Sequence, residues 1–347
     1  MTLDELVKEA LLTGTTRKPV PVSLNDPQNP EPGTDISGGD ILVIGIGTAG
    51  TKIISCLHRL AGPGLRTLVI DSNRESLEAS SASSMFYLKP TYFSGGFGLC
   101  GGDPDLFERY TTAMEMAKTD IEHRPRNPEF CFIVAGLGGN MGTGATPVIA
   151  RMMRDRGAIV TAVVSHPFSV ERKRIQRAAR GIEELSKIAN TTLILDFEKL
   201  GSALPKEMVF PHQYAVMDHI LAVAVLNFWE GTKFNSFVAF TTDDLHYMLE
   251  RGGIGTLLLG EFGPASGKKI LPDEMRVPLL DFSYEAAKGC IIHITGGYDL
   301  GLFESDQIVT SLSELFNLHT DVIWAATVKK EMEGKLRLFT VVTGLRR

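Results

Sequence analysis

The stretch from Phe132 to Pro147 constrains the fold more than any other part of this chain. An apolar run, Phe132–Ala135, leads into five glycines within nine residues, and an apolar-periodic segment follows over 147–153. These glycines are Gly136, Gly138, Gly139, Gly142 and Gly144. The order predicts a buried strand, a glycine loop and a helix. Glycines let backbone amides approach a ligand, and a helix N-terminus is partly positive, so we favour a phosphate cradle. The simpler interpretation, a tight turn, needs only one or two glycines.

A second unit of this kind comes earlier, over residues 40–71. A strand is predicted at 41–44, a helix at 51–60 and another strand at 67–70. The turn between the first two reads Gly45-Ile46-Gly47-Thr48-Ala49-Gly50, and Asp71 lies about 20 residues beyond its last glycine. This spacing is typical of dinucleotide-binding units. On these residues alone, a dehydrogenase fits.

Strands and helices continue to alternate up to about residue 200. Helices are predicted over 105–123 and 169–189, and strands over 158–164 and 192–195. This alternation predicts an α/β protein with a doubly wound parallel sheet, which binds ligands at the carboxyl ends of its strands. A third glycine-rich loop occupies 95–103. A dehydrogenase uses one such loop and no Walker motif occurs, so several loops favour a nucleoside triphosphate held by backbone amides.

A long apolar helix is predicted from Tyr214 to Phe228, and the regular alternation of strands and helices ends after it. A smaller α+β domain should follow. Its predicted strands cover 256–259, 290–295, 322–327 and 336–343, and its predicted helices cover 242–249, 303–317 and part of 264–277. We therefore divide the chain into an N-terminal segment (1–39), a nucleotide-binding domain (40–210), a central helix (211–233) and an α+β domain (234–347).

The N-terminal segment combines an amphipathic pattern with a linker. Residues 2–13 carry apolar side chains at helical spacing, and residues 14–39 are rich in proline. The polar face of 2–13 is largely acidic, so docking onto a protein surface is favoured over a free or membrane-touching helix.

Composition narrows the classes of function. The net charge is −6, the four cysteines are scattered, and no apolar run reaches the length of a membrane span. These features favour a reduced, cytoplasmic protein that does not bind nucleic acid. No clustered His/Cys set predicts a metal centre built by the protein itself.

Taken in order, these motifs resemble the tubulin/FtsZ superfamily of polymerising GTPases, and FtsZ in particular, from about Asp40 to Gly344. The signature G-G-G-T-G-[ST]-G is similar to G-G-N-M-G-T-G here. Further matches are P-F-x-x-E at 167–171, G-I-E-E-L at 181–185, P-L-L-D at 278–281 and I-T-G-G-Y-D-L at 294–300.

The resemblance implies that GTP or GDP is the ligand, with Mg²⁺. It assigns phosphate contacts to three glycine loops: Gly45, Gly47, Thr48 and Gly50; Gly98, Gly101 and Gly102; and Gly138, Gly139, Asn140, Met141, Gly142, Thr143 and Gly144. Asp71, at the end of the predicted strand 67–70, is also assigned to the nucleotide site. Glu171 would face the ribose, Arg174 would lie on the nucleotide side, and Tyr214 and Asp218 would lie at the base. A carboxylate at Asp218 suits guanine N1 and N2, which are donors; the alternative is a charge at the domain seam.

Hydrolysis in this family takes place between subunits, where an acidic loop positions water. The pattern N-x-D-x-x-D aligns with A-F-T-T-D-D here, so that Asp244 keeps the last acid and Asp243 is an extra one. The resemblance makes these two the candidate catalytic residues. The alternative is that either acid only caps a helix.

Several residues depart from the family pattern. Asn140 and Met141 replace a glycine and a threonine, Phe197 replaces a base-contacting asparagine, and Lys52 replaces another asparagine. We expect a divergent FtsZ-like protein that polymerises head-to-tail; the alternative is a nucleotide-binding scaffold with weak or no turnover. Since FtsZ binds membrane tethers through a C-terminal peptide and no such tail follows here, we expect residues 2–13 and their linker to recruit the protein to the inner face of the membrane.

Overall fold

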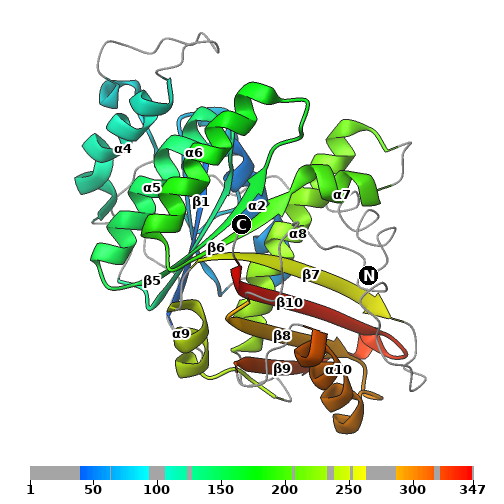
Figure 1. The fold of residues 1–347 in the computed structure, drawn as a ribbon. Coiled ribbons are helices and arrows are strands. Elements are labelled where there is room, and N and C mark those ends of the chain that lie inside the picture. The colour runs from blue at the N-terminus through cyan, green and yellow to red at the C-terminus, as the bar shows by residue number, and fades with distance from the viewer. Residues whose placement is uncertain are drawn as a thin grey trace.

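The computed structural model describes residues 40–62, 64–93, 106–122, 127–204, 208–232, 238–250, 253–262, 287–315 and 321–345. One ten-stranded sheet, in the order β3-β2-β1-β4-β5-β6-β7-β10-β8-β9, runs through these residues (Figure 1). The N-terminal segment 1–39, the loop 95–103 with Gly98, Gly101 and Gly102, and the predicted helix in 264–277 lie outside the described residues.

The first six strands form the parallel part of the sheet. They are β1 (Ile41–Ile46), β2 (Arg66–Asp71), β3 (Ser84–Tyr87), β4 (Phe130–Gly136), β5 (Ile159–His166) and β6 (Thr191–Asp196). Most of their residues are buried, because helices cover both faces. This confirms the predicted doubly wound α/β architecture.

Successive side chains of the strands point to opposite faces of the sheet and belong to two separate hydrophobic cores. On one face, α4 (Leu106–Glu122), α5 (Asn140–Asp155) and α6 (Arg172–Ile188) pack against residues such as Leu42 and Ile133. Figure 1 shows these three helices grouped on one side of the sheet. On the other face, α2 (Gly47–Ala61) and α8 (Phe210–Gly231) pack against Val43 and Phe132.

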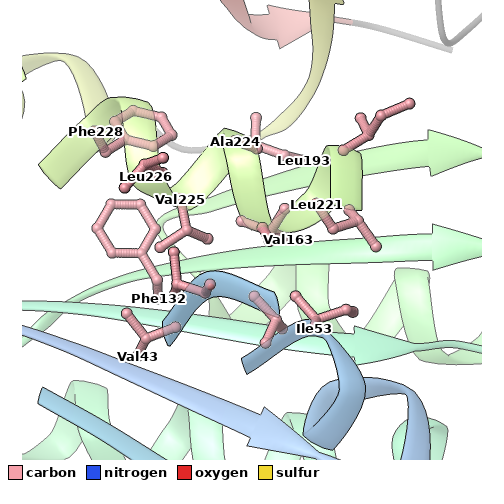
Figure 2. Close-up of a cluster of buried hydrophobic side chains, with 14 of the residues drawn as sticks. Val43, Ile53, Phe132, Val163, Leu193, Leu221, Ala224, Val225, Leu226 and Phe228 are labelled. Atoms are coloured by element: carbon pink, nitrogen blue, oxygen red, sulfur yellow. The ribbon is translucent and has the colours of Figure 1, made fainter. Parts of the chain in front are cut away.

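The central helix α8 lies in the larger of these cores. Figure 2 shows Leu221, Ala224 and Val225 of α8 above Val43 and Phe132 of the sheet. Phe228 packs on the Phe132 ring, with centroids 4.9 Å apart, and on Phe339 of the C-terminal half, 5.9 Å away. The helix therefore joins the two halves through one continuous core. Within the described chain, no helix has both the length and the apolar composition needed to cross a membrane.

The C-terminal half continues the sheet. It contains α9 (Thr242–Glu250), β7 (Ile254–Phe262), β8 (Gly289–Gly296), α10 (Leu302–Leu315), β9 (Val322–Val328) and β10 (Leu336–Leu345). Strand β7 pairs with β6 in parallel at only two positions, Thr192 with Ile254 and Leu193 with Gly255. Strand β10 is antiparallel to both β7 and β8. This half is the smaller α+β unit that the sequence predicts.

The structure corrects several predicted boundaries. Helix α5 begins at Asn140 and not at Pro147, and α2 begins at Gly47 and not at Thr51. The glycine loops are therefore shorter than predicted, and most of their residues form first helical turns. Five short elements were missed altogether: β3, α3 (Arg74–Glu78), α7 (Phe197–Ala203) and the two 3-10 turns Pro90–Tyr92 and Lys330–Met332.

Candidate functional site

Two glycine-containing turns meet at one edge of the sheet. Strands β1 and β4 are parallel neighbours, with Ile46 paired to Ala135, so their carboxyl ends lie side by side. Helices α2 and α5 begin within four residues of these ends. Gly47 and Gly138 have φ values of +70° and +93°, which favour glycine. Two helix N-termini, both with amides that lack intrahelical acceptors, are thus brought to the same place.

Other glycines in these turns are required by close backbone packing. A Cβ on Gly45 would lie 2.6 Å from the Gly50 carbonyl oxygen, and one on Gly142 would lie 2.3 Å from that of Gly136. Likewise, a Cβ on Gly144 would lie 2.7 Å from the Phe107 carbonyl oxygen. These contacts explain the glycines without a ligand, so a phosphate contact at the same residues remains a prediction.

Three side chains in the first turn of α5 shape the second glycine loop. The buried hydroxyl of Thr143 accepts the Gly138 N–H at 2.9 Å and donates to the Gly139 carbonyl at 2.6 Å. Met141 is buried, and its Cγ lies 3.3 Å from where a Cβ on Gly47 would stand. Asn140 accepts a hydrogen bond from Arg177 Nη1 at 2.5 Å. The three side chains hold the loop, and Met141 fills the space between the two turns.

Asp71, at the end of β2, is tied to the first glycine turn. Its carboxylate accepts the Thr48 hydroxyl at 3.1 Å and the Asn73 N–H at 3.1 Å. Burial raises the pKa of Asp71, and these hydrogen bonds oppose that rise. The neighbouring Ser72 hydroxyl lies 3.2 Å from the Tyr110 hydroxyl of α4. The contact between Ser72 and Tyr110 could not be predicted, since nothing in the sequence spacing links β2 to α4.

Glu171 and Arg174 lie at the start of α6, at the same edge. Arg174 Nη1 is 2.6 Å from Glu171 Oε1, while Oε2 of Glu171 is buried and has no hydrogen-bond partner among the described residues. A buried carboxylate oxygen without a donor is costly. Hydroxyl donors of a bound sugar would satisfy it, so this atom fits the predicted ribose contact.

An aromatic cluster borders these residues. Phe168, Phe197 and Tyr214 have ring centroids 5.6 to 6.0 Å apart, and Phe197 is buried in the cluster. Burial, followed by the charge of Glu171, raises the pKa of Tyr214. Phe168 and Phe197 are buried and Tyr214 is partly exposed, so the phenol ring is the part of the cluster that a planar base could contact.

Asp218 lies on α8, one turn beyond Tyr214. Burial raises the pKa of Asp218 to about 7, and the nearby Lys52 ammonium of α2 opposes that rise. Helices α2 and α8 are in contact nearby, where Cys56 Sγ of α2 lies 3.5 Å from His219 Nδ1 of α8. The sequence did not predict this influence of Lys52 on Asp218.

Helix α9 carries the candidate catalytic acids at the opposite edge of the sheet. The His246 ring lies 6.5 Å from that of Phe130, the first residue of β4, and the Leu249 carbonyl accepts the Thr191 hydroxyl of β6 at 2.7 Å. Figure 1 shows α9 just below β5. Strand β4 has seven residues, so the edges are roughly 20 Å apart.

Asp244 takes part in a capping box. Thr241 donates its N–H to Asp244 Oδ2 at 2.9 Å, and Asp244 donates its N–H to Thr241 Oγ1 at 3.1 Å. Asp243 is exposed in the same turn. The structure thus shows the capping role of Asp244, and a catalytic role for either acid stays a prediction. Across the described ranges, no group of three His, Cys, Asp or Glu side chains could hold a metal ion.

Comparison with known proteins gives the same family for both halves. Residues 40–205 match the model of the Tubulin/FtsZ family, GTPase domain, and residues 255–346 match that of the FtsZ family, C-terminal domain. Cell division protein FtsZ 2 of Haloferax volcanii is 32% identical over 346 residues, which cover 99% of this chain and 83% of that protein. Cell division protein FtsZ 2 of Methanocaldococcus jannaschii is 33% identical over 310 residues, covering 88% and 80%.

Solved structures agree with these relatives. An empty FtsZ dimer from M. jannaschii superimposes with a TM-score of 0.75 at 29% identity and covers 88% of each chain. CetZ2 from Haloferax volcanii, in a GTPγS-bound protofilament, superimposes with a TM-score of 0.72 over 89% of this chain and 94% of its own, at 19% identity, which shows the fold alone. Because the two family models match consecutive parts that together make up most of the sequence, the chain belongs to the tubulin/FtsZ family.

Proposed function

We propose that this protein binds GTP at the edge formed by α2, α5 and α6, assembles head-to-tail, and hydrolyses GTP between subunits in cell division. The relatives named as cell division proteins support the process, and the solved FtsZ dimer supports self-association. In this assignment the first-turn amides of α2 and α5 hold the phosphates. Glu171 and Arg174 hold the ribose side, and Asp218 accepts guanine N1 and N2.

One observation carries the proposal of a shared site. The glycine turns lie at the carboxyl ends of β1 and β4, whereas α9 contacts the amino ends of β4 and β6. A carboxylate roughly 20 Å away cannot orient water at a phosphate bound by its own chain. Stacking copies with one edge on the other brings Asp243 and Asp244 of one copy to the nucleotide of the next.

Bound Mg²⁺ would supply charge neutralisation at the phosphates. Since Mg²⁺ commonly takes phosphate oxygens, waters and only one or two carboxylates, it does not require a cluster of protein ligands. We propose that Asp244 of the adjoining copy is the acid nearest to it. Thr48 and Asp71 are not assigned to Mg²⁺, because the Thr48 hydroxyl donates a hydrogen bond to the Asp71 carboxylate of the same chain. This hydrogen bond fixes the first turn of α2.

The test combines phosphate release with pelleting at several protein concentrations. Turnover per molecule should rise with concentration, because the site needs two copies. Asp244→Asn keeps an acceptor for the Thr241 N–H but removes the charge, and it should lower the maximal rate about 100-fold, the usual contribution of a general base. Thr241→Ala is the matched control, since it breaks the same capping box and keeps the acid. Equal losses in both variants would mean that the cap, not the carboxylate, supports hydrolysis.

A second candidate is a nucleotide-binding scaffold with little turnover. The capping box favours it, because Asp244 already has a structural role, and so does the apolar Met141 in the first turn of α5. GTP binding without phosphate release at any concentration would support this candidate. Preference for ATP or NAD over GTP would reject both.

Recruitment to the inner face of the membrane is proposed through residues 1–39. The support is the amphipathic pattern of 2–13 and the proline-rich stretch that joins it to β1.

A further inference from the structure

Arg177, on α6, is held beside the beginning of α5. Its Nη1 donates a hydrogen bond to Asn140 Oδ1 at 2.5 Å. One turn further along α6, a Cβ on Gly181 would lie 2.6 Å from Thr143 Cγ2, so the two helices are closely packed at this point. Asn140 is the first residue of α5. The Arg177 guanidinium therefore lies next to the helix N-terminus that we assign to the phosphates.

The charge of Arg177 differs from that of its neighbours on α6 in having no acid beside it. Arg174, one turn before it, lies 2.6 Å from Glu171. Arg180, one turn after it, lies 3.7 Å from Glu108 of α4. Arg177 has instead the neutral side-chain amide at the start of α5, and no carboxylate among the described residues forms an ion pair with it.

This position is unfavourable for a cation when no ligand is bound. The first-turn amides of α5 carry partial positive charge, so the helix end and the guanidinium repel each other. Arg177 is partly buried, which limits the screening of this repulsion by solvent and salt. Its other N–H donors have no partner in the described part of the chain. An anion at this point would neutralise both positive groups and accept the free donors.

The next residue of the same turn gives a second reason to expect that Arg177 supplies donors. Met141 is buried and fills the space between the two glycine turns, where the family signature has a threonine. A thioether cannot donate a hydrogen bond to a phosphate oxygen. The guanidinium, fixed one residue away through Asn140, offers donors and a full positive charge in place of that hydroxyl.

We propose that Arg177 is a phosphate-binding residue, and that Asn140 is the positioning residue that holds its guanidinium against the phosphate chain of the nucleotide. The inference rests on the proposed function, because it assumes that the phosphates bind at the first turn of α5. It gives Asn140 and Met141, the two departures from the family signature, a common explanation: one residue removes a donor, and the other recruits a replacement from α6.

Removing the guanidinium should weaken binding only through the phosphates. Arg177→Met should raise the Kd for GTP about 10- to 100-fold at low salt, the range expected for a hydrogen bond to a charged group. The Kd for guanosine, which has the base and the ribose but no phosphate, should stay unchanged. Because salt screens partly exposed charges, the loss for GTP should shrink between 50 mM and 500 mM salt.

The experiment measures binding of GTP and guanosine to the full chain by competition with a fluorescent GTP analogue, at protein concentrations too low for assembly. Lys187→Met is the control for net charge, since it removes an exposed cation from the far end of α6. Arg177→Lys keeps the charge without the planar fork and should recover part of the affinity. Asn140→Ala should weaken GTP binding in wild type but change little in Arg177→Met, because the amide acts through the guanidinium.

Equal losses for GTP and guanosine would assign Arg177 to bracing of the loop and overturn the inference, while GTP binding by wild type would keep the proposed function. An unchanged affinity for GTP, or a loss that salt does not alter, would also overturn it. Inorganic tripolyphosphate separates the two proposals. If it binds in an Arg177-dependent way and GTP shows no advantage over ATP, the guanine assignment fails and Arg177 remains a phosphate ligand. Wild-type protein that binds neither GTP nor tripolyphosphate rejects both.

Discussion

His293 offers a sharp test of how the two halves are joined. It is buried on β8, where its Nδ1 lies 2.7 Å from Asn227 Oδ1 of α8 and its Nε2 lies 2.9 Å from Thr327 Oγ1 of β9. Burial lowers the pKa of His293 to about 3, and the positive charges of Lys329 and Arg337 add to this. The imidazole is therefore neutral throughout the ordinary pH range of the folded protein.

The lowered pKa makes folding stability depend on pH. Below the ordinary pKa of 6.5 the unfolded chain binds a proton at His293, whereas the folded chain binds none until about pH 3. Stability from this group is thus complete above pH 6.5 and is lost as the pH falls. Between pH 7 and pH 5 the free energy of unfolding falls by about 2 kcal/mol because of this group. The size of this fall depends little on the pKa of His293 in the folded protein, because pH 5 lies well above that pKa.

The assay is urea unfolding at pH 7 and pH 5, followed by tryptophan fluorescence. Trp229 and Trp324 lie on α8 and β9, the elements that His293 joins. His293→Gln keeps a hydrogen-bonding side chain that does not titrate, so its stability should fall by about 2 kcal/mol less than that of wild type over this interval. His212→Gln, at an exposed position of α8, is the control. If wild type and His293→Gln lose the same free energy, the reasoning is refuted.

Three further predictions concern packing, the junction and the N-terminal segment. Gly144→Ala should destabilise the fold by about 1–3 kcal/mol, measured by urea unfolding, because its Cβ would lie 2.7 Å from the Phe107 carbonyl oxygen; Gly301→Ala, with open space, should not. Lys329 Nζ lies 2.8 Å from Glu230 Oε1, and a double-mutant cycle with Lys329→Met and Glu230→Gln should give a coupling of about 1 kcal/mol that shrinks in 1 M salt. Deleting residues 1–38 should abolish co-sedimentation with vesicles or a tether while nucleotide binding stays unchanged; unchanged sedimentation would exclude this segment as the recruiting element.

The parallel part of the fold could be predicted because its signals are local. Apolar runs such as 41–44 and 132–135 end in glycines, and helical periodicity follows them, so both the strand order along the chain and the site edge are visible in the sequence. The starts of α2 and α5 could not be placed, since glycine-rich first turns look like loop. Backbone atoms occupy the space where a Cβ on Gly142 or Gly144 would lie, and for Gly144 they belong to Phe107 of α4, so the need for this glycine is a tertiary effect.

The site was predicted as a set of positions rather than as a set of contacts. The sequence marks Lys52 only as a departure from the family pattern, and its electrostatic influence on Asp218 was not predicted, because the packing of α2 on α8 cannot be read from either segment alone. The capping role of Asp244 could be anticipated, since Thr241 stands three residues before it. The link between Asn140 and Arg177 could not, because 37 residues separate them.

Helix α8 also fixes the angle, around its own axis, between a side chain that faces the nucleotide-binding half and one that faces the C-terminal half. Asp218 and Asn227 are nine residues apart (227 − 218), which at about 100° per residue places them on opposite sides of the helix. Asp218 therefore lies on the side proposed to read the nucleotide, whereas Asn227, about 14 Å along the axis, contacts His293 of the C-terminal sheet. A substitution on α8 changes individual contacts. Inserting a single residue between Asp218 and Asn227 would instead rotate one of these side chains about 100° relative to the other. The length of this segment is therefore as constrained as its composition.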